Sequence, residues 1–292
     1  MERKKIKIDF IKTCECKNNH INCLTAKEWI KNQLGVWQFY YEKRDIRDKG
    51  KHPATYPISL ARRIIELFTH QGELVLDPFN GSGTTLVAAK DTDRNAIGFD
   101  ISEEYCDLTK DRIAQENLIN KSSQIVICDD ARKISNYLDN NTVSLSITSP
   151  PYANLLNRKR KNKSRRGETR KNSQYMKVEQ YSQNENDLGI LGVEEFETEV
   201  YKIYKKMLPV IKPGAHVVIN IADMWWEGNR VPLHISIIKA LEKAGYIFRN
   251  TIIWDRTNIV NRIGIFGWPS NYITMGTTFE FILDFIKPKE VS

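Results

Sequence analysis

Residues 73–85 carry the sequence Glu-Leu-Val-Leu-Asp-Pro-Phe-Asn-Gly-Ser-Gly-Thr-Thr, an apolar run that ends at Asp77 and is followed by glycines at positions 81 and 83. The apolar run predicts a strand that is buried on both faces. The glycines allow a tight turn in which the backbone approaches a ligand closely, and the helix expected from residue 83 offers unpaired N–H groups. This strand, turn and helix are typical of the first unit of a nucleotide-binding α/β sheet, although a purely structural turn needs the same residues.

The rest of the chain repeats this alternation of short apolar runs and amphipathic stretches. We expect strands over 73–77, 96–100, 124–128, 143–148, 215–221, 246–254 and 278–286, and helices over 58–69, 83–90, 103–117, 131–138, 193–211 and 232–244. This order predicts an α/β fold with a doubly wound, mostly parallel seven-stranded sheet of the Rossmann-like kind. Because no helix long enough for a parallel crossover separates the last two strands, the last strand should pair antiparallel.

Carboxylates follow the first three expected strands. Asp100 ends the second strand and is placed to bind the two hydroxyls of a ribose. Asp129 and Asp130 end the third strand; one of them could accept a hydrogen bond from an adenine amino group, and Asp130 could equally cap the next helix. Since no P-loop lysine follows the Gly-rich turn, we expect an adenosine ligand without phosphates.

The fourth expected strand runs into Thr148-Ser149-Pro150-Pro151-Tyr152, a turn that two prolines make stiff. An amino group on an aromatic base is a poor nucleophile, because its lone pair is delocalised into the ring. The Ser149 side chain and the Pro150 carbonyl could accept its protons and draw the nitrogen toward tetrahedral geometry, while Tyr152 stacks on a base extruded from the duplex. Catalysis would then rest on positioning and electrostatics. The alternative is a rigid turn that merely leaves a strand.

Together these motifs resemble those of the S-adenosylmethionine-dependent DNA amino-methyltransferases, which make N4-methylcytosine or N6-methyladenine. Residues 77–85 resemble the methionine-binding motif of the beta group, residues 148–152 the catalytic motif, and residues 51–57 the segment that closes over the cofactor. The resemblance implies a class I methyltransferase fold, S-adenosyl-L-methionine as cofactor and double-stranded DNA as substrate. In one respect the chain departs from the beta group: its cofactor motif precedes its catalytic motif, so it looks circularly permuted.

The resemblance also implies roles for individual residues. It places the methionine end of the cofactor at Phe79, Gly81 and Gly83, the ribose at Asp100 and the adenine near Asp130. The full set of implied cofactor-binding residues is Asp77, Phe79, Gly81, Ser82, Gly83, Thr84, Asp100, Ile101 and Asp130. The implied catalytic residues are Ser149, Pro150, Pro151 and Tyr152.

Serine at position 149 resembles the cytosine-N4 enzymes more than the adenine-N6 enzymes, which usually carry aspartate there. We therefore expect methylation of cytosine N4 in a specific duplex sequence, in a restriction–modification or phage system, with a cognate restriction endonuclease as a second partner. The alternatives are an adenine-N6 enzyme on the same fold, a non-catalytic nucleic-acid-binding relative and an RNA enzyme. Methylation of cytosine C5 is disfavoured because it needs a thiolate nucleophile, and no cysteine follows a proline near this turn.

The net charge of +8 comes from one segment. Residues 158–171 hold nine Lys or Arg and one Glu, so the rest of the chain is neutral. Because this segment closely follows the catalytic motif, we expect its basic side chains to contact DNA phosphates rather than to form only a solvated loop. The predicted contacts are Arg158, Lys159, Arg160, Lys161, Arg165 and Arg166.

Two further regions lie outside the alternation of strands and helices. Residues 1–45 form an expected N-terminal appendage, and about residues 153–190 form a basic insertion in a catalytic domain of residues 46–292. The basic N-terminus has no apolar core of a signal peptide, and no stretch is long enough to span a membrane, so we expect a cytoplasmic protein of a bacterium, archaeon or phage without a membrane partner.

The five cysteines predict no disulfide framework, because their number is odd and no secretion signal accompanies them. Cys14, Cys16 and Cys23 could ligate zinc together with His20. Their spacing is tighter than the common pattern and no second cysteine pair follows. We therefore expect buried or idle thiols and no metal site.

Overall fold

The computed structural model describes residues 5–6, 11–17, 19–47, 55–115, 121–153, 184, 186–226, 229–259, 267–268, 272–273 and 277–289. Six predicted DNA contacts lie outside these residues: Arg158, Lys159, Arg160, Lys161, Arg165 and Arg166.

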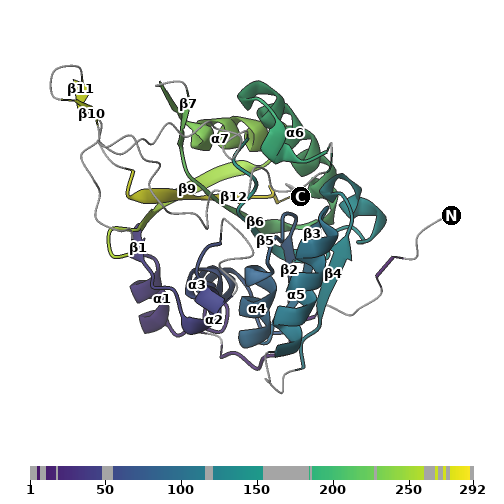
Figure 1. Cartoon of the computed structure of the whole chain (residues 1–292). Coiled ribbons are helices and arrows are strands. Elements are labelled where there is room, and N and C mark those ends of the chain that lie inside the picture. Colours follow the sequence, from purple (N-terminus) through teal and green to yellow (C-terminus); the bar gives the residue numbers. More distant parts are fainter. Residues whose placement is uncertain are drawn as a thin grey trace.

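An eight-stranded sheet forms the centre of the molecule, with the strand order β1-β9-β12-β6-β5-β2-β3-β4 (Figure 1). Its strands are β1 (Val36–Gln38), β2 (Leu74–Asp77), β3 (Asn95–Asp100), β4 (Gln124–Cys128), β5 (Val143–Thr148), β6 (Ile211–Ile221), β9 (Ile247–Asp255) and β12 (Phe279–Ile286). All neighbouring strands pair in parallel except β12, which is antiparallel to both β6 and β9. The predicted fold class and the antiparallel last strand are thus confirmed. The expected count of seven strands is one too few, because β1 adds an edge strand.

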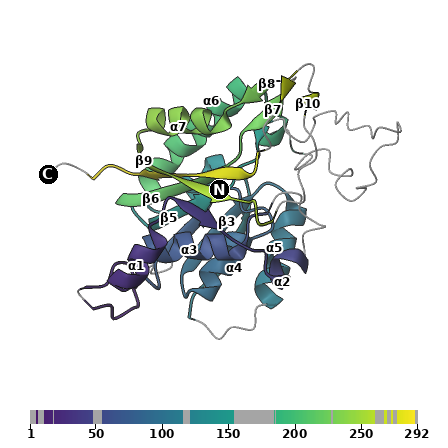
Figure 2. The ribbon, with the colours of Figure 1, turned by 90° about the vertical axis from the view of Figure 1, so that its left-hand side faces the viewer.

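Helices cover both faces of this sheet, with α3 (Ile58–Phe68), α4 (Thr84–Asp91) and α5 (Glu103–Gln115) on one face and α6 (Val193–Met207) and α7 (Leu233–Ala244) on the other (Figures 1 and 2). The side chains of β2 show why the strand is apolar throughout. Leu74 and Leu76 pack into the core cluster beneath α6 and α7, whereas Val75 packs into the cluster beneath α3 and α4. None of the described helices is long and apolar enough to cross a membrane.

Short elements complete the described chain. They are the helices α1 (Ala26–Asn32) and α2 (Lys43–Arg47), the 3-10 helices η1 (Ala131–Asn136), η3 (Leu188–Ile190) and η4 (Leu208–Val210), and the ribbons β7 (Met224–Trp226) with β8 (Asn229–Val231) and β10 (Gly267–Trp268) with β11 (Tyr272–Ile273). The helix expected over 193–211 ends at Met207, because Pro209 belongs to η4 and β6 begins at Ile211. The stretch expected as a helix over 131–138 is the 3-10 helix η1.

The predicted N-terminal appendage of residues 1–45 contributes directly to the sheet. Its strand β1 pairs in parallel with β9 along Val36, Trp37 and Gln38. Trp37 is 2 % exposed, packs edge-to-face against Phe39, and is covered by the guanidinium of Arg63 at 5.1 Å from its ring centre. Residues 36–39 are therefore part of the main core and not an independent unit.

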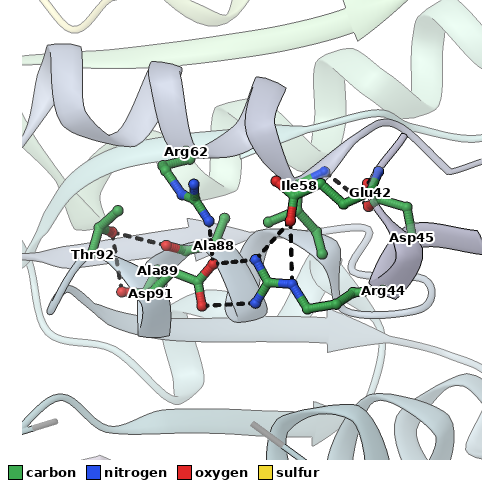
Figure 3. Close-up of polar contacts among 9 residues, drawn as sticks. All are labelled: Glu42, Arg44, Asp45, Ile58, Arg62, Ala88, Ala89, Asp91 and Thr92. Atoms are coloured by element: carbon green, nitrogen blue, oxygen red, sulfur yellow. Dashed lines mark hydrogen bonds and ion pairs between the residues drawn. The ribbon is translucent and has the colours of Figure 1, made fainter. Parts of the chain in front are cut away.

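Charged side chains attach the next segment, α2, to two core helices (Figure 3). The Asp45 carboxylate accepts the N–H of Ile58 at 3.0 Å and so caps α3, whose N-cap residue is a proline without a side-chain acceptor. Arg44 and Arg62 both bind the carboxylate of Asp91 at the end of α4, at 2.7 and 2.5 Å. The segment that precedes α3 is thus held in place against α3 and α4.

Replacing Trp37 with alanine should lower the free energy of unfolding by about 3–5 kcal/mol, because it empties a fully buried aromatic site. Val36→Ala is the matched control, since Val36 lies on the same strand but is 61 % exposed. Urea unfolding of both variants measures the difference. Equal stabilities would contradict a core role for β1.

Candidate functional site

A cavity of about 890 Å³, its open mouth included, lies at the carboxyl ends of the parallel strands. The chain places β3 and β4 on one side of β2 and then returns to place β5 on the other, so the cavity lies where the strand order reverses. Ligands of open α/β sheets bind at this position. The segments Phe79–Ser82 and Ser149–Tyr152 both line the cavity, together with Asp100, Ile101 and Asp130. The two motifs of the sequence therefore face each other across one space.

The Gly-rich turn takes its shape from two left-handed glycines. Gly81 has φ +51° and Gly83 has φ +81°, which side chains other than glycine rarely adopt. The Thr109 hydroxyl of α5 donates to the Gly81 carbonyl at 3.0 Å and accepts from the Asn80 amide at 2.9 Å. Gly83 is the N-cap of α4 and lies against Thr109, outside the lining of the described cavity. Its left-handed backbone sets the path of the turn that borders the pocket.

Asp77, one of the expected cofactor-binding residues, is surrounded by hydrogen-bond donors of the protein. Its side chain is buried, lies outside the described cavity lining, and accepts hydrogen bonds from Thr148 at 2.5 Å, the Phe79 N–H at 3.1 Å, Tyr56 at 3.4 Å and Thr85. Burial raises the pKa of Asp77 to about 6, while these hydrogen bonds oppose the shift. Both carboxylate oxygens accept hydrogen bonds from the protein. Asp77 therefore holds Thr148, the Phe79 backbone and Thr85 in position around the end of β2.

Asp100 lines the cavity with an organised pair of acceptors. One carboxylate oxygen accepts the Gly81 N–H at 2.8 Å and the other accepts the Ser102 N–H at 2.9 Å. Each oxygen keeps a further lone pair, which suits the two neighbouring hydroxyls of a ribose. Burial raises the pKa of Asp100 to about 7, against the lowering effect of these two hydrogen bonds.

Asp130 also lines the cavity, but its carboxylate has structural partners. One oxygen accepts the Arg132 N–H at 2.8 Å and caps η1, and the other pairs with the Arg132 guanidinium at 2.7 Å. Arg132 in turn binds Glu199 of α6 at 2.6 Å. Of the two roles that the sequence left open, the structure shows the helix cap.

The charges around the cavity fit an adenosyl ligand that carries positive charge. The described lining includes four carboxylates, those of Asp100, Asp129, Asp130 and Asp187, and its one cationic side chain, Arg132, is paired with two of the chain's carboxylates. Such a lining repels phosphates, as the missing P-loop lysine predicts. Asp187 and Leu188 belong to the end of the predicted insertion 153–190, so this end forms part of the pocket.

Hydrogen bonds orient the proline-stiffened corner after β5. The Tyr152 hydroxyl donates its single proton to Glu280 at 3.2 Å, so the Ser149 hydroxyl, 3.2 Å away, must be the donor of the Ser149–Tyr152 hydrogen bond. The lone pairs of Ser149 Oγ then remain as acceptors. Pro150 has no backbone N–H, and it lines the same cavity.

Three residues that support this corner are absent from the sequence-based set. Glu280 of β12 is 7 % exposed and binds Asn220 of β6 at 2.6 Å as well as Arg256, which follows β9. A carboxylate in the otherwise apolar run of residues 279–283 is the signal that could have identified it. Its partners lie far away in the chain, so their pairing becomes visible only in the folded sheet.

The three clustered cysteines lie at the other end of β2. Cys14, Cys16 and Cys23 group with His70, which immediately precedes β2, and not with the predicted His20. The structure places no disulfide bond among the five cysteines, all of which belong to the described residues. We expected buried or idle thiols, and the structure brings three of them together with His70 as a group of four potential metal-ligating side chains.

Comparison with known proteins finds two matching family models and several similar methyltransferases. A family model described as DNA methylase matches residues 2–111 and 143–291, and a model described as D12 class N6 adenine-specific DNA methyltransferase matches residues 58–204. The type II methyltransferase M2.DpnII of Streptococcus pneumoniae is 41 % identical over 90 residues, which are 31 % of this chain and 34 % of that protein. The type II methyltransferase M.HpaI of Haemophilus parainfluenzae is 36 % identical over 85 residues, 29 % of this chain and 27 % of that protein. The chain thus spans about a third or less of the length of these relatives.

Replacing Gly83 with alanine should lower the free energy of unfolding by at least about 1 kcal/mol, the cost of a left-handed backbone for a residue with a Cβ. The added Cβ would also lie 2.5 Å from the Thr109 Cγ2, so either α5 or the turn must shift. Gly35→Ala is the control, because no atom lies within 4 Å of its Cβ position. Chemical unfolding measures both variants, and an unperturbed Gly83→Ala protein would refute the strained turn.

Proposed function

This chain belongs to the DNA methylase family, and on that premise we propose that it transfers the methyl group of S-adenosylmethionine to an exocyclic amino nitrogen of a base in double-stranded DNA. The observation that carries this proposal is the single cavity that the Gly-rich turn and the Ser149–Tyr152 corner share. A methyl donor at one wall and an amino group at the other would meet within it.

The cofactor, when bound, supplies a methyl group on a positively charged sulfur. In our proposal Asp100 accepts the ribose hydroxyls, and Phe79, Gly81 and Ser82 contact the methionine end. The neighbouring carboxylates favour the positive charge of the ligand. Asp77 and Gly83 hold the turn from outside the cavity, and Asp130 shapes the adenine end through its cap on η1.

Ser149 and Pro150 would orient the amino group of an extruded base. The Ser149 Oγ lone pairs and the Pro150 carbonyl accept the two N–H protons, which directs the nitrogen lone pair out of the ring plane and toward the methyl carbon. Tyr152 stacks on the base, and its hydroxyl is fixed by Glu280. These acceptors are held in place before the base arrives, so they cost little reorganisation during transfer.

For the target base we propose cytosine N4, because serine stands at position 149 at the start of the catalytic motif. The second candidate is adenine N6, which the match of residues 58–204 to the D12 class N6 adenine-specific model favours. We further propose that Arg158, Lys159, Arg160, Lys161, Arg165 and Arg166 contact DNA phosphates. Since the relatives are type II methyltransferases, we propose a cognate restriction endonuclease as the functional partner.

Incubation with labelled S-adenosylmethionine and unmethylated plasmid, followed by nucleoside analysis, tests this function. We expect label in N4-methylcytosine. Label in N6-methyladenine would replace the cytosine assignment by the second candidate. Absence of label from DNA, with cofactor binding intact, would refute the proposed reaction.

Ser149→Ala should lower kcat about 10–100-fold, as expected for the loss of one hydrogen bond to a group that gains charge, while cofactor affinity stays unchanged. Ser146→Ala in β5, the strand that leads into the corner, is the matched control, because the buried Ser146 hydroxyl has no hydrogen-bond partner among the described residues. Single-turnover kinetics separates methyl transfer from binding. Full activity of Ser149→Ala would remove the proposed role of this hydroxyl.

Cofactor affinity should weaken as the pH falls through about 7, because Asp100 then takes up a proton and loses its capacity to accept from both ribose hydroxyls. Asp100→Asn should lose at least about tenfold in affinity and should remove this pH dependence. The control is Asp107→Asn on the exposed face of α5. Calorimetric titration with S-adenosylhomocysteine gives both quantities; a pH-independent affinity of the unmodified protein would contradict the role of Asp100.

A further inference from the structure

Four side chains form a closed tetrahedral arrangement far from the cavity. The Sγ atoms of Cys14, Cys16 and Cys23 lie 3.0, 3.2 and 3.3 Å from one another. The Nδ1 atom of His70 lies 3.4, 3.6 and 3.5 Å from these three sulfurs. Six similar distances among four points define a tetrahedron, and the sulfurs are too far apart for a disulfide bond of about 2.05 Å.

The size of this tetrahedron matches one metal ion. A regular tetrahedron with edges of this length has its centre roughly 2 Å from each corner, close to the Zn–N distance of about 2.0–2.1 Å and the Zn–S distance of about 2.3 Å. Three sulfurs and one imidazole nitrogen in tetrahedral geometry select zinc over the harder, oxygen-seeking cations. Four protein ligands also leave no position for substrate, which is the mark of a structural site.

The backbone brings the three cysteines to His70 by contacts that do not involve sulfur. The Thr13 N–H donates to the Gln71 carbonyl at 2.8 Å, and the Asn22 side chain donates to the Leu67 carbonyl at 2.7 Å. Asn22 and Cys23 both adopt left-handed conformations, with φ +49° and +73°, in a two-residue turn closed by Ile21 and Leu24. Asparagine adopts this conformation readily, whereas cysteine rarely does, and the turn brings Cys23 into the cluster.

Gly72 shows that the chain is fitted closely around the cluster. Its φ is +83°, and an added Cβ would collide with the Ile11 carbonyl and the Thr13 side chain. The segment that carries Cys14 and Cys16 therefore crosses directly over the turn that carries His70. Glu73 fixes this turn from the other side, since its carboxylate accepts the His70 N–H at 2.7 Å.

The guanidinium of Arg94 is a buried positive charge beside the cluster. Arg94 is 3 % exposed and donates to the Thr69 hydroxyl, the Thr69 carbonyl and the Thr92 carbonyl, all of which are neutral. No described carboxylate forms an ion pair with it; Cys23, Glu66, Cys14 and Glu73 interact with it electrostatically at longer range. Zinc with three thiolates and a neutral imidazole carries a charge of −1, which would add to the negative charge around Arg94.

We propose that Cys14, Cys16, Cys23 and His70 bind one structural zinc ion that fastens the N-terminal segment of residues 11–24 to the turn before β2. The site lies at the amino end of β2, whereas the cavity lies at its carboxyl end, so the ion stabilises the domain and takes no part in methyl transfer. This inference does not depend on the proposed function.

Metal analysis of the full chain, purified without chelators, tests the proposal. We expect about one zinc ion per chain by elemental mass spectrometry. Replacing the zinc with cobalt should give the visible absorption of a tetrahedral thiolate site. Chelation should lower the unfolding temperature and make three of the five thiols newly reactive. It should also expose residues 11–24 to proteolysis, because the tether is lost.

Variants of the fourth ligand separate metal binding from folding. His70→Ala should lose the zinc, whereas His70→Cys should retain it, because a thiolate replaces the imidazole. His20→Ala and Cys128→Ser are the matched controls, since neither residue belongs to the tetrahedron, and both should keep the full metal content. If His70→Ala fails to fold, the metal contents of the His70→Cys variant and of the unaltered chain still show whether the cluster binds zinc.

Three results would overturn the proposal. The first is a protein that folds with negligible zinc and with the thiols of Cys14, Cys16 and Cys23 reactive. The second is a mass lower by two hydrogens, which would reveal a disulfide within the cluster. The third is stoichiometric iron in place of zinc, which would refute the metal assignment.

Discussion

The carboxylate of Asp77 is the contact on which the arrangement of the cavity depends. Asp77 is the last residue of β2, and its carboxylate accepts hydrogen bonds from Thr148 at the end of β5 and from Thr85 in the first turn of α4. Thr148 precedes the Ser149–Tyr152 corner, and α4 follows the Gly-rich turn. One buried acid therefore couples the two walls of the cavity. Because an unpaired charge is costly in this position, the donors and the acid must remain together for either wall to keep its shape.

Local chemistry explains how much of the fold was predictable. Apolar runs bounded by acids, glycines and prolines located the seven expected strands to within a few residues, since such strands are covered on both faces. β1 was missed because a strand of three residues has too short a pattern, and because it is defined by its pairing with β9, more than 200 positions later. The end of α6 was missed because the apolar pattern continues through η4 into β6.

The candidate site was predictable in outline and less so in the roles of its residues. The motifs identified Asp100 and the Ser149–Tyr152 corner as cavity residues, because their position at strand ends fixes where they lie. Sequence could not show that the oxygens of Asp77 turn inward, or that Asp130 is engaged by Arg132. It also missed His70 as the neighbour of the cysteines, because only the tertiary fold brings together residues that are 47 to 56 positions apart. In each case the deciding partner is distant in the chain.

The pairing of β1 at the outer side of β9 has a consequence for protein engineering. A shortened version that starts at residue 46 would discard β1 and leave the backbone of β9 without its parallel partner. An open strand edge of this kind can pair with strands of other molecules. The apolar side chains that Trp37 covers would also become exposed. Such a version would be prone to aggregate even though every motif of the cavity is retained, so fusion or truncation points belong before residue 36 and, to keep the proposed zinc ligands, before Cys14.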